Sequence, residues 1–191
     1  MKLLIASSNP HKAKEFSEIL YPLEIIPAPK TIDVIEDGTT FTENAHKKAK
    51  SYFDKYKCPI IADDSGLIVE SLPNELGLFS ARFGEIGMDY TQKCELLLKK
   101  MNGIAERTAY FISSICVIFS ELETYFFEGR IDGQIGHQLK GHKGFGFDPI
   151  FIPNEMPEYS LAEIPEWKNE NSHRAKSCEK LKNFLKYRLS K

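Results

Sequence analysis

The short segment SSNPHK places several hydrogen-bond donors and one positive charge directly after the apolar run KLLIA. Asn9 followed by Pro10 is typical of a helix N-cap and a first helical position, so we expect a helix to begin here. The free N–H groups of that helix, together with the side chains of Ser7, Ser8 and Lys12, would bind phosphate oxygens. The spacing differs from that of a Walker P-loop. An ordinary capped helix with a solvent-exposed lysine explains the same residues equally well.

Three carboxylates are candidates for a divalent-cation site. Asp63 and Asp64 follow the buried run PIIA, and only one of them can face a given cleft because neighbouring residues of a strand point to opposite faces. Glu43 lies in the first turn of a predicted helix. A carboxylate at a strand end and one at a helix start could share Mg²⁺, which needs few protein ligands when it also binds substrate phosphates. The alternatives are a local turn for the aspartates and a capping box with Thr40 for Glu43.

A glycine-rich segment, GFGFDP, carries two aromatic rings beside a carboxylate. If Phe145 and Phe147 are exposed on a flexible turn next to Asp148, their rings could stack on a nucleotide base. The alternative is that both rings fill the core.

The predicted C-terminal helix begins near Ser172 and has His173 and Arg174 in its first turn, where the helix dipole disfavours cations. Arg174 is easier to explain if it faces an anion or a carbonyl oxygen, and Lys168 lies shortly before it. The segment from Lys168 to the C-terminus contains eight Lys or Arg residues and two Glu, which also fits a solvated helix face.

The apolar pattern predicts the elements that must position these residues. The first part of the chain should form a strand over 2–6, a helix over 10–20, a strand in LEIIPAP and a helix with an apolar stripe from Phe41 to Tyr56. A strand over 59–62 that ends at Asp63 and Asp64 should follow, and then a further strand in GLIVESL and a helix over 89–101. Two hairpin strands are expected over 107–119 and 123–135. Cys94, Cys116 and Cys178 lie on apolar faces and are expected in the core. Alternating strands and helices followed by a hairpin favour an α/β fold with a mixed sheet.

The composition is that of an ordinary globular protein, with 191 residues, 42% of them hydrophobic and 27% charged. A net charge of −2 creates no overall field toward nucleic acid or membranes, so we expect neither as a partner. The N-terminal apolar run is too short for a signal peptide. The four cysteines lack a C-x-x-C pair, which argues against a zinc module and a disulfide framework. A reducing cytoplasm is the expected location.

In their order along the chain, the segments SSNPHK, FTENA, ADDSGL, SARF, GFGFDPIF and NSHR resemble the inosine/xanthosine triphosphate pyrophosphatases, also called XTP/dITP diphosphatases. The resemblance runs from residue 3 to about residue 185. It implies one domain over residues 1–191, built on a bent mixed β-sheet flanked by helices, with two lobes and a central cleft. It also implies Mg²⁺-dependent hydrolysis of ITP, dITP and XTP to the monophosphate and pyrophosphate, by a homodimer.

The resemblance also implies roles for individual residues. Phosphate contacts are expected from Ser7, Ser8, Asn9 and Lys12. Magnesium ligation is expected from Glu43 and Asp64, with Asp64 also the proton acceptor, and a further substrate contact is expected from Ser65. The base-stacking turn comprises Phe145, Gly146, Phe147 and Asp148. Contacts to the base are expected from Lys168, His173 and Arg174.

Two other functions remain open at this point. A related nucleotide pyrophosphatase of the septum-inhibitor type acts on modified pyrimidines, but its opening turn usually carries arginine in place of Lys12. A non-enzymatic binder of nucleotides or single strands would use the basic C-terminal helix and the aromatic pair. That second alternative leaves Glu43 and Asp64 unexplained.

Overall fold

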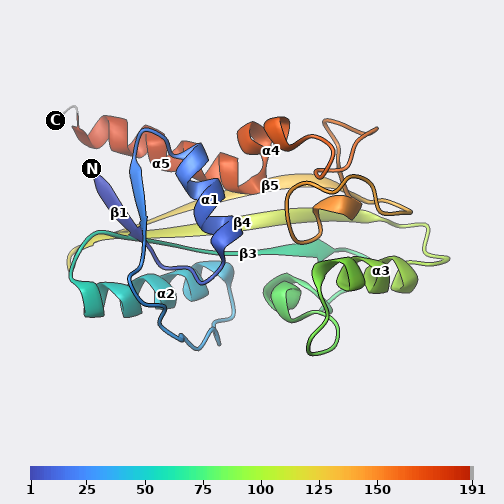
Figure 1. The fold of residues 1–191 in the computed structure, drawn as a ribbon, viewed down its shortest axis with the longest axis horizontal. Helices are drawn as coiled ribbons and strands as arrows, with labels where there is room; N and C mark the ends of the chain where they lie inside the picture. The colour runs from blue at the N-terminus through green and yellow to red at the C-terminus, as the bar shows by residue number, and fades with distance from the viewer. Residues whose placement is uncertain (190–191) are drawn as a thin grey trace.

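The computed structural model describes residues 1–189, in which six strands form one mixed β-sheet (Figure 1). The strands are β1 (Lys2–Ile5), β2 (Glu24–Pro27), β3 (Ile60–Val69), β4 (Thr108–Ser120), β5 (Glu123–Ile135) and β6 (Phe151–Pro153), in the order β2-β1-β3-β4-β5-β6. β1 pairs in parallel with β2 and β3, and the remaining neighbours are antiparallel. The predicted mixed sheet and the β4–β5 hairpin are confirmed. The last two residues of the predicted domain, 190 and 191, lie outside the described residues.

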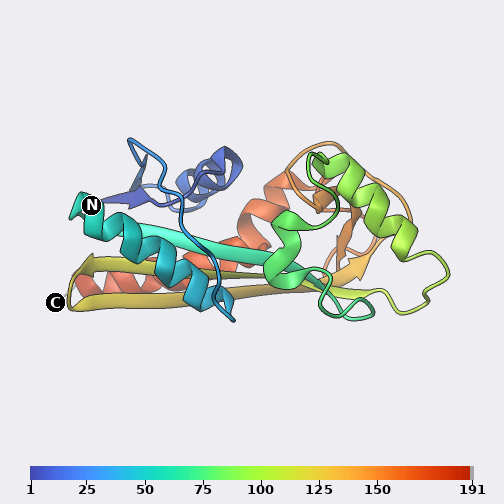
Figure 2. The ribbon, with the colours of Figure 1, turned by 90° about the horizontal axis from the view of Figure 1, so that it is seen from below.

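Helices cover both faces of this sheet. One face carries α1 (Pro10–Ile19), α4 (Pro165–Asn171) and α5 (His173–Leu189), and the opposite face carries α2 (Phe41–Tyr56), while α3 (Tyr90–Lys100) lies at the far end of the long strands (Figures 1 and 2). Two short 3₁₀ helices, η1 (Gly77–Arg82) and η2 (Asp148–Ile150), complete the architecture. Within residues 1–189, every helix falls short of the length and apolar character that crossing a membrane would require.

The apolar core has three parts. One part, which includes Phe16 and Cys178, lies between the sheet and helices α1 and α5. A second, which includes Ala49 and Cys116, lies under α2. The third, which includes Cys94, gathers α3, η2 and β6 around the far ends of β3, β4 and β5. The long strands therefore run through both lobes of the molecule (Figure 2), and the three cysteines are fully buried as predicted.

Strand β3 is longer than the sequence predicts. The expectation that a strand ends at the aspartates is wrong, because β3 continues without interruption to Val69. Ser65 and Gly66 pair with β4 in the same ladder as the residues before them. A Cβ on Gly66 would lie 2.2 Å from the Gly77 carbonyl oxygen, so glycine is needed here to admit η1 against the strand. What looks like a turn signal in the sequence is therefore a close approach inside a strand.

Helix α5 makes a similar approach to β5 at Gly129. A Cβ at this position would lie 2.1 Å from the His173 carbonyl oxygen and 2.5 Å from the Ser177 backbone nitrogen. The missing side chain lets the first turn of α5 lie directly on the sheet. That turn carries His173 and Arg174, so the contact sets their height above the strands.

Candidate active site

A cavity of about 770 Å³ lies where the two lobes meet. Its walls come from the turn before α1, the loop before α2, the middle of β3, η1, the glycine-rich turn and the start of α5. Among the lining residues are the predicted Ser7, Ser8, Asn9, Lys12, Asp64, Ser65, Phe145, Gly146, Phe147, Asp148, Lys168, His173 and Arg174. Of all the predicted site residues, Glu43 alone is not among the described residues that line this cavity.

The turn before α1 is a capped helix start that also faces the cavity. The Asn9 side-chain oxygen accepts hydrogen bonds from the backbone nitrogens of His11 at 2.9 Å and Lys12 at 3.4 Å. The Ser7 hydroxyl accepts one from the Asn9 backbone at 3.1 Å. The capped helix is therefore confirmed, but the solvent-exposed lysine of that alternative is wrong, because the Lys12 side chain is only 16% exposed and lies on the cavity wall with the serines.

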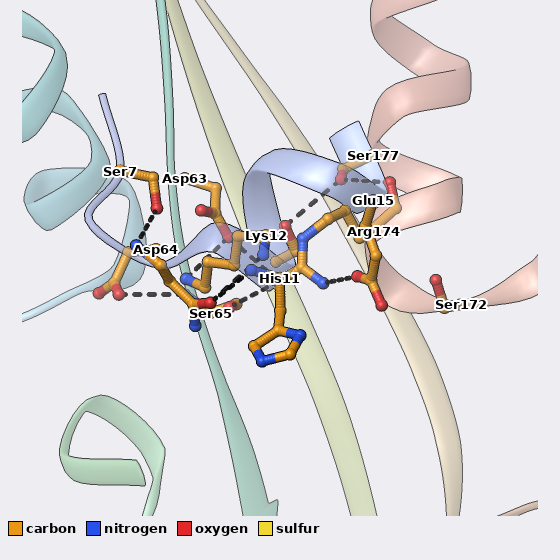
Figure 3. Close-up of polar contacts among 12 residues, drawn as sticks. Ser7, His11, Lys12, Glu15, Asp63, Asp64, Ser65, Ser172, Arg174 and Ser177 are labelled. Carbon is orange, nitrogen blue, oxygen red and sulfur yellow. Dashed lines mark hydrogen bonds and ion pairs between the residues drawn. The ribbon is translucent and has the colours of Figure 1, made fainter. Parts of the chain in front are cut away.

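Asp63 and Asp64 point to opposite faces of β3, as the alternation of a strand requires. On one face, Asp63 lies 3.1 Å from the Lys12 ammonium and 3.3 Å from the Arg174 guanidinium (Figure 3). Although burial acts to raise it, these positive charges lower the pKa of Asp63. Burial lowers the pKa of Lys12, and the charge of Asp63 opposes that shift.

On the other face, Asp64 meets helix α2. Its Oδ2 accepts a hydrogen bond from the Asn44 amide at 3.1 Å, and its Oδ1 lies 3.6 Å from the Lys48 ammonium. Burial raises the pKa of Asp64 above its usual value, against the lowering effect of Lys48. Lys48 also pairs with Glu36 at 2.9 Å, and both residues line the cavity. Sequence reasoning missed both, because neither belongs to a segment that stands out in the sequence.

Glu43 lies at the start of α2, where its carboxylate is already engaged. Its Oε2 accepts hydrogen bonds from the Thr39 backbone nitrogen at 2.6 Å and the Thr39 hydroxyl at 2.9 Å. The Glu43 backbone in turn donates to the Thr40 hydroxyl at 3.1 Å. This geometry favours the helix-capping alternative, and metal ligation by Glu43 stays a prediction.

A buried carboxylate that sequence reasoning missed, Glu15, connects two cations of the cavity wall. Glu15 accepts hydrogen bonds from Lys168 at 2.6 Å and from Arg174. Lys168 also donates to Asp148 at 2.6 Å. Although burial lowers it, these carboxylates raise the pKa of Lys168. The signal that could have found Glu15 is its place on the inward stripe of α1, where an acidic residue needs a buried cation.

The two phenylalanines of the glycine-rich turn have different environments. Phe147 is only 3% exposed and packs edge-on against Phe83 and Tyr90 in the core. Phe145 is half-buried, stacks beside His11 at a ring separation of 5.4 Å and has the Lys168 ammonium 4.8 Å from its ring centre. Of this pair, Phe145 therefore offers the more accessible aromatic surface to a ligand.

His173 is buried against Phe111, with nearly parallel rings 4.8 Å apart. Burial lowers the pKa of His173 far below its usual value, and the neighbouring Arg174 adds to this shift. The ring is therefore neutral at pH 7 and has one donor and one acceptor nitrogen. Its Nδ1 is buried without a hydrogen-bond partner among the described residues.

The donor set fits a cation that completes its coordination with substrate oxygens. Within residues 1–189, no group of three or more His, Cys, Asp or Glu side chains is arranged to hold a metal ion. Two carboxylates, Glu36 and Asp64, do converge on one ammonium group at the cavity wall. Mg²⁺ commonly binds one or two carboxylates together with phosphates and water, and this pair is compatible with that pattern.

Comparison with known proteins confirms the predicted resemblance. The sequence model of the Ham1 family matches residues 3–184. The dITP/XTP pyrophosphatase of Aquifex aeolicus (strain VF5) is 39% identical over 198 residues, which cover 97% of both chains. That of Listeria monocytogenes serotype 4b (strain F2365) is 41% identical over 194 residues, covering 96% of this chain and 94% of the relative. The solved Ham1 protein of Staphylococcus aureus superposes with a TM-score of 0.85 at 33% identity, covering 98% of this chain and all of the other. The chain therefore belongs to the Ham1 family.

Proposed function

We propose that this chain, as a single domain, hydrolyses the non-standard purine nucleotides ITP, dITP and XTP to the monophosphate and pyrophosphate. It is a nucleoside-triphosphate pyrophosphatase. The observation that carries this proposal is one cavity whose wall combines two sets of donors. One set is Lys12 with the α1 N-terminus, and the other is the buried pair Lys168 and Arg174, with Asp63 between Lys12 and Arg174. The first set suits a triphosphate and the second suits the carbonyl oxygens of a base.

The residues around Asp64 would carry the reaction. Bound Mg²⁺ would supply positive charge to the phosphates and help to activate water. We propose Asp64 and Glu36 as its carboxylates, with Glu43 as the sequence-based alternative. The Asp64 carboxylate, on the wall of the cavity, would accept the proton of the attacking water. Attack at the α-phosphorus breaks the α–β bond, and pyrophosphate leaves.

The phosphates would be bound by the turn before α1. Backbone N–H groups at a helix N-terminus attract anions, and Lys12 adds a full charge. Ser7 and Ser8 add hydroxyl donors, and Asn9 fixes the turn by capping the helix. These groups would hold the triphosphate and stabilise charge on the leaving pyrophosphate.

Base selection would follow from hydrogen-bond type. Lys168 and Arg174 have only donors, and Glu15, Asp148 and Asp63 hold them in place. Hypoxanthine and xanthine have an oxygen at position 6 that can accept, whereas adenine has an amino group that would face a donor. A buried donor left unpaired in this way can reduce the reaction rate by several orders of magnitude.

A substrate panel tests this function. The protein is incubated with ITP, XTP, dITP, ATP, GTP and dTTP, with and without Mg²⁺, and pyrophosphate is measured. We expect rapid release from the first three alone, and its loss on chelation. Fast release from ATP, or none from ITP, contradicts the proposal, and preference for a pyrimidine would favour the septum-inhibitor type. A binder without turnover would instead lose nucleic-acid affinity steeply with salt.

Two matched variants link turnover to the proposed base. Asp64→Asn removes a carboxylate on the cavity wall and should lower the rate by about 10²- to 10⁴-fold. Asp54→Asn removes an exposed carboxylate from α2, where it pairs with Lys50, and should leave the rate unchanged. Full activity of the Asp64 variant would end its assignment as proton acceptor.

We also propose that the protein is a cytoplasmic homodimer. The proposed substrates belong to the nucleotide pool, and the protein would remove them from it. Sedimentation equilibrium at micromolar concentration should give twice the chain mass of 21.8 kDa, and a monomer would contradict the dimer.

A further inference from the structure

Two carboxylates of the cavity wall converge on a single ammonium group. The Lys48 nitrogen lies 2.9 Å from Glu36 Oε2 and 3.6 Å from Asp64 Oδ1. Glu36 comes from the loop before α2 and Asp64 from β3, so a helix side chain joins two acidic groups that are distant in the sequence. This is the charge arrangement of a cation site, with a lysine in the cation's position.

The contacts of Asp64 are already complete without a metal ion. Oδ2 accepts from the Asn44 amide, and Oδ1 accepts from the Ser65 backbone at 3.0 Å and faces Lys48. The side chains of Lys48 and Asp64 are 14% and 12% exposed, so water screens their interaction only weakly. A divalent cation approaching these carboxylates would meet a like charge a few ångströms away.

We propose that Lys48 acts as an internal counter-cation that keeps the affinity of the nucleotide-free site for divalent cations low. The inference rests on the proposed function and deepens it. A triphosphate carries several negative charges and offers Lys48 another partner on the same cavity wall. Its arrival would draw the ammonium from Glu36 and Asp64, and the carboxylates would then be free for the cation that accompanies the nucleotide. The metal ion and the nucleotide would therefore bind together.

The main test measures Mn²⁺ binding without nucleotide, from loss of the electron paramagnetic resonance signal of the free ion. We expect weak binding by the natural protein and at least about tenfold tighter binding by Lys48→Met, within the range typical of coupling between two sites. Lys48→Arg keeps the charge and should bind as weakly as the natural protein. Lys50→Met removes an ion pair with Asp54 from the exposed face of the same helix and should change nothing.

A second measurement uses the natural protein, so it does not depend on a variant that folds. Amine-selective labelling followed by mass spectrometry reports the reactivity of each lysine. Saturating Mn²⁺ should raise the labelling of Lys48 at least about threefold, because the cation displaces it from its carboxylates, while Lys50 stays constant. If Mn²⁺ and the Lys48 ammonium compete for the same carboxylates, both effects must occur. Removing the ammonium must tighten Mn²⁺ binding, and bound Mn²⁺ must release the ammonium.

The outcomes separate this inference from the proposed function. If Lys48→Met binds Mn²⁺ no more tightly than the natural protein, or if Lys48 labelling is unchanged at saturation, the counter-cation role is wrong. Turnover of dITP by the natural protein, measured on the same preparation, would leave the proposed function intact in that case. If dITP is not hydrolysed, the proposed function fails whatever the Mn²⁺ data show.

Discussion

At the scale of single residues, the site depends on pairs of charges that each occupy one face of a strand or helix. Asp63 and Asp64 are neighbours, yet one is neutralised from α1 and the other faces α2. The same geometry favours Glu36 over Glu43 as the second carboxylate of the proposed metal site. Glu36 faces the cavity, whereas Glu43 accepts hydrogen bonds from Thr39.

Two glutamine variants decide between these carboxylates. Glu36→Gln should raise the Mg²⁺ concentration for half-maximal dITP hydrolysis at least about tenfold, because it removes a charge from the site. Glu43→Gln should leave that concentration unchanged and slightly lower the melting temperature through a weaker helix cap. If Glu43 is the ligand, the two results are reversed. The measurement is a Mg²⁺ titration of activity for each variant, with thermal unfolding alongside.

His173 should make stability depend on pH below the ordinary pKa of histidine. The folded state keeps this ring neutral, and the unfolded state takes up a proton below its ordinary pKa of 6.5. Unfolding therefore binds protons, and stability is lost as pH falls from 6.5, by up to about 1.4 kcal/mol per pH unit. The lowered pKa of Glu15 contributes only below its ordinary value of 4.5.

Urea unfolding at pH 7 and pH 5 checks this dependence. His173→Gln cannot titrate and should lose less stability between the two pH values than the natural protein. His137→Gln, at an exposed position after β5, should behave as the natural protein does. An unchanged pH slope in the His173 variant would show that the ring is protonated in the folded state as well.

At the scale of elements, the position of α5 depends on the absence of a side chain in β5. Gly129→Ala would place a Cβ against the backbone of the first turn of α5, so the helix must shift. We expect a loss of about 1–3 kcal/mol in stability from overpacking. We also expect at least about a tenfold loss in the preference for ITP over ATP, because Arg174 moves with the helix. The measurements are unfolding free energies and the ratio of kcat/KM values.

Gly136→Ala is the matched control, since a Cβ there meets its neighbours at an ordinary 3.5 Å. It should change neither the stability nor the preference appreciably. If Gly129→Ala lowers stability but leaves the preference for ITP intact, the helix position does not govern base selection.

Local signals predicted much of this arrangement, and their failures have physical causes. The Asn9 cap, the hairpin and the start of the last helix are each determined by residues within a few positions, and they were predictable. The end of a strand at Asp64 was wrongly predicted, because Ser65 and Gly66 look like a turn until η1 is seen packed on them. The burial of Glu15 could have been predicted from its place on α1, but its partners Lys168 and Arg174, like the partners of Lys48, lie far away in the chain and could not.

At the scale of the whole molecule, the cavity takes its walls from both lobes. A bound ligand should therefore contact both lobes and stabilise the folded protein. In the Asp64→Asn variant, ITP with Mg²⁺ at about 100 times its Kd should stabilise the protein by about 2.7 kcal/mol. For a chain of this size that corresponds to a rise of roughly 5–10 °C in melting temperature. ATP at the same concentration should give a much smaller rise, and single-stranded DNA none. Equal shifts with ITP and ATP would contradict the assigned base site.

The uninterrupted run of β3 restricts how this protein can change in length. Inserting or deleting one residue within that strand would exchange the faces to which Asp63 and Asp64 point, and each lysine would meet the wrong partner. The surface loops on either side have no such constraint. Homologues and variants that remain active should therefore differ in length in those loops but keep the number of residues from Ile60 to Val69 unchanged.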